Sequence, residues 1–217
     1  MKTILLTVIF LTLTVSIFAT SQAPDKIIYK EQEYSLNTNP LESFFEKNPK
    51  LRPESRIMST ALWRGYIATF EIRDNQLFVK DIVVMDEDTT TSSQKTTCRS
   101  VFNQVFPNQK QIKVDWLTGL LVIPNGKLVN YVHMGYASTY ENYILLEIDK
   151  GNLKQEKTMK RKEYEKFKEK QFKAFQKTDD YKKLKEELKK NDGGTDEFLD
   201  SFIKIYVTDY STKILTE

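Results

Sequence analysis

The sequence predicts an α+β fold, in which a largely antiparallel β-sheet of five to seven strands precedes two or three helices. Between residues 24 and 150, apolar and polar residues alternate over several segments, which is the period of a β-strand. Short turn sequences separate these segments and favour hairpins and a meander. From Lys154 to Lys190 β-branched residues almost disappear, Lys and Glu dominate, and apolar residues recur at helical spacing. We therefore expect a β-rich domain over 22–150 and a helical C-terminal region over 151–217.

The first 21 residues have the pattern of a cleavable signal peptide. A positive start at Lys2 precedes an apolar run over 4–18, and small residues follow it. Cleavage after Ser21 places Ala19 at the −3 position, whereas a cut after Ala23 would leave Pro24 just beyond it. An uncleaved membrane anchor is the alternative. We expect signal cleavage and a periplasmic or secreted protein.

The first half of the β-rich domain begins with a small hairpin over 24–36. Asn39-Pro40 then predicts the start of a short helix that ends near Asn48, because Asn caps helices and Pro suits their first position. After a polar loop, the strand pattern over 60–73 is the strongest in the chain. The pair Asp74-Asn75 predicts a turn into a return strand over 76–84.

The second half of this domain starts with a polar stretch over 86–98 that we expect to be a loop. Apolar residues at helical spacing follow over 101–106, and a strand is expected over 112–123. Pro124-Asn125-Gly126 predicts a hairpin turn with a return strand over 127–133. A last strand is expected over 140–148.

The helical region shows one aromatic stripe and two capping signals. The stripe consists of Tyr164, Phe167, Phe172 and Phe175. Thr178 and Thr195 are placed to cap a second and a third helix, and the sequence between these helices, 191–194, breaks the helical pattern. The sequence is compatible with a region that docks on the sheet and with one that projects from it.

Two segments resemble a known family. The stretch Leu62-Trp63-Arg64-Gly65-Tyr66-Ile67-Ala68-Thr69-Phe70-Glu71-Ile72 and the stretch over 119–148, with Tyr131 to Tyr140, are similar to a family of uncharacterised exported bacterial proteins with a WRGYxATFxI strand motif. Together they cover less than half of the mature chain. The resemblance implies a bacterial source and a shared β fold, and it implies no chemistry.

Aromatic residues in these two segments suggest a binding face. Trp and Tyr combine an apolar ring with a polar tip and are enriched at recognition surfaces. If the two hairpins are neighbours, their ends form an aromatic groove for a protein or a small molecule, with Arg64 at its rim. The alternative reading places Trp63 and Tyr66 in the core and Arg64 on the surface. The residues predicted for this face are Trp63, Arg64, Tyr66, His133, Tyr136 and Tyr140.

Catalytic, metal and cofactor signals are weak. Cys98 and the single histidine, His133, are a conceivable nucleophile and base, but the sequence around Cys98 has no nucleophile signature. The carboxylates Asp115, Glu141 and Glu147 have no spacing that defines a metal site with His133. Three adjacent acids over 86–88 lack the pattern of a calcium loop. We expect no cofactor, and a hydrolase with a site near His133 is the alternative function.

The charge distribution gives a third reading. The formal net charge of +3 makes nucleic-acid binding unlikely, but Lys154–Lys190 holds fifteen basic and eight acidic residues, a net +7. This region suits weak contact with an anionic surface in an envelope-associated structural protein, or it is simply a solvated helix face. The expectation we favour is an exported, non-enzymatic binding or interaction module.

Overall fold

The computed structural model describes residues 20–57, 59–88, 95–191 and 193–215, so most of the expected signal peptide lies outside the described residues. The α+β class is confirmed: the described residues form a nine-stranded, largely antiparallel sheet, followed by helices. The strands are β1 (Asp25–Tyr29), β2 (Gln32–Leu36), β3 (Tyr66–Arg73), β4 (Gln76–Asp88), β5 (Lys95–Ser100), β6 (Ile112–Lys113), β7 (Gly119–Asn130), β8 (Thr139–Asp149) and β9 (Asn152–Lys160).

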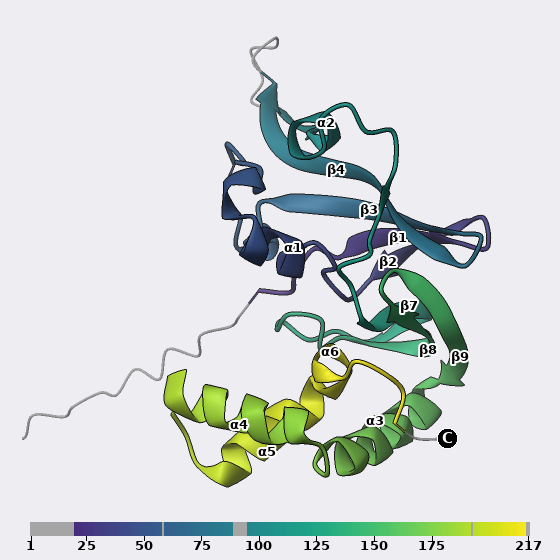
Figure 1. Cartoon of the computed structure of the whole chain (residues 1–217), viewed down its shortest axis with the longest axis vertical. Coiled ribbons are helices and arrows are strands. Elements are labelled where there is room, and N and C mark those ends of the chain that lie inside the picture. The colour runs from purple at the N-terminus through teal and green to yellow at the C-terminus, as the bar shows by residue number, and fades with distance from the viewer. Residues whose placement is uncertain (1–19, 58, 89–94, 192, 216–217) are drawn as a thin grey trace, which may run out of the picture.

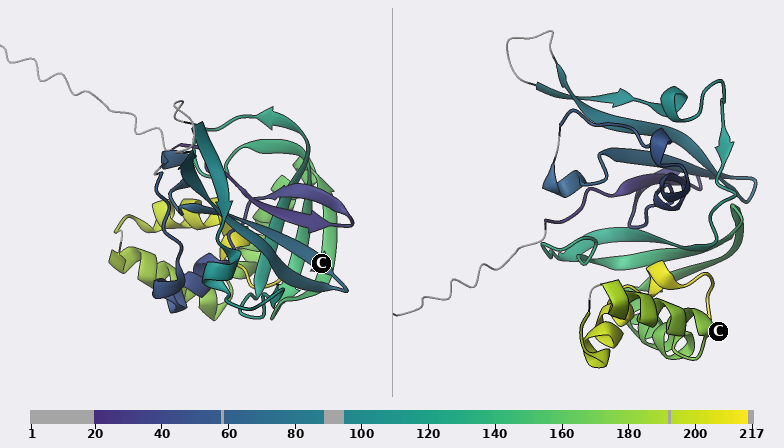
Figure 2. Two further views of the ribbon diagram at one scale, coloured as in Figure 1. Left: turned by 90° about the horizontal axis from the view of Figure 1, so that it is seen from above. Right: turned by 60° about the vertical axis from the view of Figure 1, so that its left-hand side comes forward.

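The sheet curves so far that its two ends approach each other. Its order is β2-β1-β3-β4-β9-β8-β7, with β5 and β6 on the edge of β4, and the β1–β3 pair is parallel. Just after β2, the backbone N–H of Asn37 donates to the carbonyl of Val122 in β7 over 2.9 Å. The strands therefore surround a common interior, as the view from above shows (Figure 2).

Three two-residue turns fix the hairpin registers. Lys30-Glu31, Asp74-Asn75 and Lys150-Gly151 all have positive φ at both positions, which is the geometry of the type I′ turn that matches strand twist. The predicted hairpins over 24–36 and 60–84 are confirmed by the β1–β2 and β3–β4 pairings. The strand of the second hairpin starts later than expected, since 60–62 form a 3₁₀ turn (η2, Thr60–Leu62) and Gly65 has a φ of +79°.

The predicted hairpin turn at Pro124-Asn125-Gly126 is wrong. β7 runs through these residues as one strand along β8, and the register shifts between Asn125 and Leu128. Gly126 adopts a φ of +83° there, so the Asn-Gly pair makes a β-bulge instead of a turn. Pairing with β8 over the whole length of β7 overrides the local turn preference.

Two other boundaries differ from expectation. Residues 152–160 form β9 and not the start of the helical region, because they pair with β8 along almost their full length. In the polar stretch over 86–98, which was expected to be a loop, residues 86–88 belong to β4 and 95–98 to β5, and these strands pair; residues 89–94 lie outside the described part of the chain. In both segments sheet hydrogen bonds outweigh a polar composition that predicts loop or helix.

The helices are α1 (Glu42–Lys47), α2 (Phe102–Val105), α3 (Arg161–Phe175), α4 (Asp179–Asn191), α5 (Asp196–Ile205) and α6 (Val207–Tyr210), with a 3₁₀ turn η1 (Pro49–Leu51). Thr178 and Thr195 accept hydrogen bonds from the backbone N–H groups of Tyr181 and Phe198, so both predicted caps are confirmed. Asn39 does not cap α1, since the residue before this helix is Leu41 and no side-chain cap forms.

The core is divided between the interior of the sheet and its outer face. Inside, apolar side chains from β1 to β4 meet those of β7 and β8 and of the short helices α1 and α2. Outside, Leu120, Tyr143 and Leu145 pack against Tyr164 and Phe167 of α3. Tyr164 and Phe167 of the predicted aromatic stripe therefore dock α3 on the sheet, whereas Phe172 and Phe175 pack against α4, α5 and α6 beside it (Figure 1).

Candidate functional site

A cavity of about 130 Å³ lies between the β7–β8 connection and the helical layer. Residues 136–139 of the connection form one wall, and α3 and α6 form the other. The connection stays folded because the Ser138 hydroxyl accepts from the N–H of Val132 at 3.0 Å and donates to its carbonyl at 3.4 Å. The cavity is lined by Asn37, Val122, Tyr136, Ala137, Ser138, Thr139, Tyr143, Arg161, Tyr164, Glu165, Lys168, Ile205, Tyr206, Thr208 and Asp209.

Tyrosine rings form much of the cavity wall. Tyr143 of β8 and Tyr164 of α3 stack with ring centroids 4.1 Å apart, and Tyr140 meets Tyr143 edge-on at 6.4 Å. Burial raises the pKa of Tyr164 and of Tyr143, so both remain neutral hydroxyls at physiological pH. The wall therefore offers aromatic faces and hydroxyl groups, which suit an organic molecule with both apolar and polar parts.

Charged groups face the same cavity from α3 and α6. Arg161 and Glu165 are paired at 3.0 Å, one turn apart on α3. Lys168, a turn further along, forms no ion pair with any described residue, and burial lowers its pKa, against the attraction of Glu165 and Asp209. Desolvation raises the pKa of Asp209 to about 6, against a hydrogen bond from Thr208 and the charge of Lys168.

Asp209 lies at the solvent-exposed margin of the cavity. Many protein atoms surround its carboxyl group, yet the residue is exposed to solvent. Water that enters the cavity offsets part of the desolvation of this carboxyl group. The cavity thus presents an ammonium group and a carboxyl group that are not ion-paired with each other.

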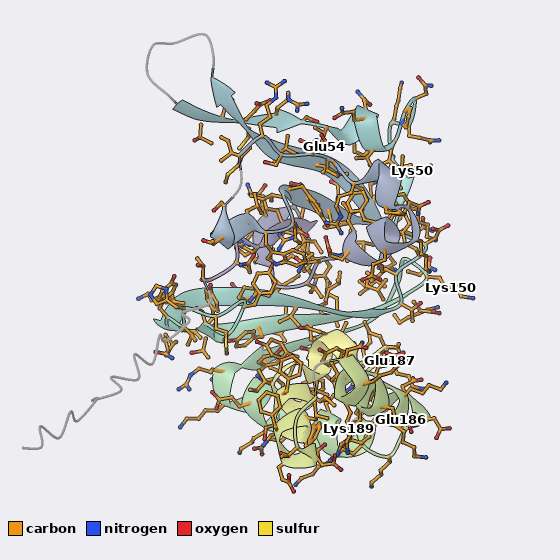
Figure 3. The ribbon with its side chains drawn as sticks, turned by 90° about the vertical axis from the view of Figure 1, so that its left-hand side faces the viewer. Lys50, Glu54, Lys150, Glu186, Glu187 and Lys189 are labelled. Carbon is orange, nitrogen blue, oxygen red and sulfur yellow. The ribbon has the colours of Figure 1, made fainter. Side chains whose placement is uncertain are left out.

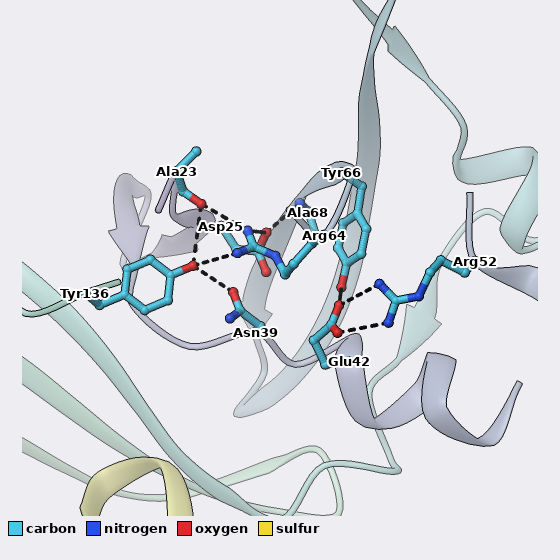
Figure 4. A network of polar contacts seen from close by, with 9 residues as sticks. All are labelled: Ala23, Asp25, Asn39, Glu42, Arg52, Arg64, Tyr66, Ala68 and Tyr136. Atoms are coloured by element: carbon cyan, nitrogen blue, oxygen red, sulfur yellow. Dashed lines mark hydrogen bonds and ion pairs between the residues drawn. The ribbon is translucent and has the colours of Figure 1, made fainter. Parts of the chain in front are cut away.

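A buried polar network lies behind the Tyr136 wall (Figure 4). The Arg64 guanidinium contacts the Asp25 carboxylate at 3.3 Å and donates to the Ala23 carbonyl at 3.0 Å and to the Tyr136 hydroxyl at 2.9 Å. The Tyr136 hydroxyl in turn donates to Asn39 Oδ1 at 2.9 Å. This network joins the N-terminal segment, β3 and the β7–β8 connection, so it fixes the position of one wall of the cavity.

Burial dominates the electrostatics of this network. The side chains of Asp25 and Arg64 are 0% exposed. Desolvation raises the pKa of Asp25 to about 7, although Arg64 and the N–H of Ala68 favour its charged form. The pKa of Arg64 is also raised: burial opposes this rise, but the attraction of Asp25 and the tyrosines outweighs it, so Arg64 stays charged. Of the two partners, Asp25 is the one that changes protonation.

The second half of the network joins β3 to α1. The Tyr66 hydroxyl donates to Glu42 Oε1 at 2.7 Å, and Arg52 holds both oxygens of that carboxylate at 3.1 and 2.9 Å. Tyr66 itself is fully buried. Its role is therefore to anchor α1 to the sheet.

The prediction of an aromatic groove with Arg64 at its rim is wrong in its geometry. Arg64 is buried because Gly65 turns the chain before β3, which directs the guanidinium towards Asp25. Tyr66 is buried, as the alternative reading expected, whereas Trp63 is 63% exposed and lies outside the core. The condition on which the groove depended is met, since the Arg64–Tyr136 hydrogen bond joins the two segments.

The other predicted residues divide between the cavity and the surface. Tyr136 lines the cavity, and Tyr140 packs against the stacked rings beside it. His133 is exposed in the β7–β8 connection, where its ring meets Tyr131 edge-on at 4.6 Å. Whether a ligand contacts any of these residues stays a prediction.

The weak catalytic signals gain no common site in the described part of the chain. Cys98 is exposed on β5 opposite Met85, while His133 lies in the β7–β8 connection, and no hydrogen bond joins them. Among the described residues, no group of three or more His, Cys, Asp and Glu side chains is placed to hold a metal ion. Asp86 pairs with Arg99 at 2.8 Å and with Arg56 at 3.5 Å.

Lys168, Tyr206 and Asp209 are cavity residues that the sequence reasoning missed. Arg161, Glu165 and Lys168 recur at a spacing of four and three residues, which places them on one face of a helix beside the aromatic stripe. That spacing was visible in the sequence. The contribution of 206–209 was not, because it depends on α6 returning to the sheet.

Comparison with protein-family models, curated proteins and solved structures finds no match to this chain. The family resemblance of the two β segments therefore stays an expectation. In the described part of the chain, no helix has both the length and the apolar character needed to span a bilayer.

Proposed function

We propose that this chain is an exported, non-enzymatic binding protein that holds a small polar ligand in the cavity between the β7–β8 connection and α3 and α6. The observation that carries the proposal is the cavity itself, in which tyrosine rings surround the unpaired Lys168 and Asp209. Concave sites with aromatic walls and a few polar groups are the usual form of small-molecule sites. Export is supported by the signal-peptide pattern of the first 21 residues.

The charges of the cavity favour a ligand that carries charges of both signs. A carboxylate or phosphate group on the ligand would pair with Lys168, and an amino group would pair with Asp209. The ligand's carbon skeleton would lie against the Tyr206 and Tyr143 rings. A cavity of about 130 Å³ accommodates a compact molecule such as an amino acid more readily than an oligomer.

Binding is favoured over hydrolysis by the state of the candidate nucleophiles. Ser138 lines the cavity, but its hydroxyl is bonded to the Val132 backbone in both directions. His133 meets a tyrosine ring and does not line the cavity. Thr208 donates a hydrogen bond to Asp209, but Thr208 is buried, so its hydroxyl is poorly placed to attack a bound substrate.

Thermal-shift measurements with defined probes test the proposal. The probes are the common α-amino acids, with neutral monosaccharides as a comparison set. A ligand present at about 100 times its Kd adds about 2.7 kcal/mol, which raises the Tm of a chain of this size by about 5–10 °C. We expect at least one amino acid to raise the Tm, and both Lys168→Gln and Asp209→Asn to abolish the shift.

Glu187→Gln is the matched control, because Glu187 (labelled in Figure 3) is exposed on α4 and does not line the cavity. This variant should keep the full shift. If no amino acid raises the Tm of the wild-type protein, or if the shift survives in both cavity variants, the proposed site is wrong. A shift produced by sugars alone would contradict the inferred charge pattern of the ligand.

A further inference from the structure

Four lysines form a continuous stripe on the outer face of α3. Lys162, Lys166, Lys170 and Lys173 are spaced by four, four and three residues, so they follow one side of the helix. All four are exposed, and they lie opposite the face that Tyr164 and Phe167 bury against the sheet. At 1.5 Å per residue the stripe extends about 16 Å along the helix axis.

The acidic residues of α3 do not neutralise this stripe. The Glu163 carboxylate accepts from the backbone N–H of Lys160 at 2.8 Å, Glu165 pairs with Arg161 at 3.0 Å, and Glu169 pairs with Lys204 at 3.3 Å. The four lysines of the stripe have no ion pair with a described residue.

Other lysines of the chain behave differently. Four of them, on β9, α4 and α5, each pair with an acidic side chain at 2.9 to 3.6 Å: Lys154, Lys182, Lys189 and Lys204. The stripe differs from these four lysines in that its four ammonium groups, which follow one another along one side of α3, have no ion pair with a described residue.

We propose that the Lys162–Lys173 stripe binds a linear phosphate polymer through its backbone charges. Lysine is a compact point charge that pairs with phosphate oxygens without demanding a fixed orientation, which suits a flexible polyanion. Lys166 and Lys170 also border a shallow hollow lined by Thr158, Met159 and Phe167, where a polymer chain lies beside the stripe. This inference is independent of the cavity and its ligand.

A membrane surface and a nucleic acid are less suitable partners. A helix that lies on a bilayer inserts an apolar face, but the aromatic residues of α3 are buried against the protein. Single-stranded nucleic acids are bound through aromatic side chains that stack on bases, and α3 presents no exposed aromatic residue beside the stripe. Both features favour a partner recognised by its phosphates alone.

Fluorescence anisotropy with labelled long-chain inorganic polyphosphate tests the proposal. Four engaged lysines give a slope of about −3 for log K against log salt, so affinity should fall roughly 50-fold between about 50 and 200 mM salt. Replacing all four stripe lysines with glutamine should weaken binding at low salt by at least about tenfold and bring the slope near zero.

The control variant replaces Lys26, Lys154, Lys182 and Lys189 with glutamine, because each of these lysines pairs with an acidic residue outside α3. It loses the same formal charge, but the residues removed are already paired, so it should bind polyphosphate nearly as well as the wild-type protein. Both variants change exposed side chains, and circular dichroism melting checks that each is folded. Equal loss in the two variants would mean that only net charge matters and would overturn the proposal.

Two further probes separate the alternatives. Vesicles containing anionic phosphatidylglycerol should bind more weakly than polyphosphate, and oligo(dT) with the same number of phosphates should bind no more tightly. Tighter, stripe-dependent binding to the vesicles would assign α3 to a membrane surface instead. Tighter binding to oligo(dT) would assign it to nucleic acid, and no binding to polyphosphate would leave the stripe without this role.

Discussion

Replacing Arg64 with methionine removes the cation from a fully buried ion pair. The variant loses the contact to Asp25 at 3.3 Å and the hydrogen bonds to the Ala23 carbonyl and the Tyr136 hydroxyl. Asp25 keeps only the N–H of Ala68, at 2.9 Å. Methionine fills part of the volume, so the main effect is an uncompensated buried carboxylate.

The expected magnitude follows from this arrangement. Breaking a buried ion pair by removing one partner typically costs about 3–5 kcal/mol, because the remaining charge has no water around it. For a chain of this size, that corresponds to a fall in Tm of about 6–20 °C. Since domains are stable by only about 5–15 kcal/mol, the loss is a large fraction of the free energy of unfolding.

Urea denaturation followed by circular dichroism, at pH 8, measures the effect. Arg56→Met is the matched control, since Arg56 is 73% exposed and pairs with Asp86 at 3.5 Å, and it should cost less than about 1 kcal/mol. The double variant Asp25→Asn, Arg64→Met should be more stable than Arg64→Met alone, because the stranded charge is gone. A cost below about 1 kcal/mol for Arg64→Met would refute the reasoning.

Three other predictions concern Asp25, a turn and the N-terminus. Burial raises the pKa of Asp25 from 3.8 to about 7, so the folded state binds this proton more tightly than the unfolded state, and the free energy of unfolding falls as pH rises from about 4 to 7. In urea titrations at pH 5 and pH 8, Asp25→Asn should reduce this fall, and an unchanged pH dependence would contradict the prediction. Gly151→Ala should lower the free energy of unfolding by about 1–3 kcal/mol, and by more than Gly135→Ala. Both glycines have positive φ, but only at Gly151 would a Cβ lie 2.7 Å from the Val114 carbonyl oxygen, so equal costs would show that backbone strain alone matters. Intact mass of the protein from cell fractions should correspond to a chain that starts after Ser21 and is found in the periplasm or medium, whereas a full-length mass in the cytoplasm would contradict export.

Local signals in the sequence predicted the parts of the fold that depend on neighbouring residues. Asp74-Asn75 specifies its turn because both residues tolerate the left-handed backbone that a type I′ turn requires. Thr178 and Thr195 cap helices through hydroxyl groups that reach backbone N–H groups three residues ahead. The aromatic stripe of α3 was predicted from its spacing, and its side chains pack the helix on the sheet and on the helices that follow.

Pairing between strands that are distant in the sequence decided the structure of two segments that local sequence signals predicted wrongly. The pair Asn125-Gly126 is equally compatible with a turn and with a bulge, and only the length of β8 alongside it selects the bulge. Residues 152–160 have a helical composition, yet the edge of β8 offers them hydrogen bonds along nearly the whole segment. Long-range pairing of this kind is not contained in any window of sequence.

The sequence by itself determined the α+β class, the β1–β2 and β3–β4 hairpins, the caps of two helices and the amphipathic face of α3, because each rests on contacts within a few residues along the chain. The tertiary structure alone decided that Arg64 is buried against Asp25, that α6 returns to the sheet, and that Tyr136, Lys168 and Asp209 face one cavity. These three residues are separated by 32 and 41 positions in the chain. Their proximity comes from the packing of α3 and α6 on β7 and β8, which buries apolar surface over the whole layer and leaves the charged groups at its margin.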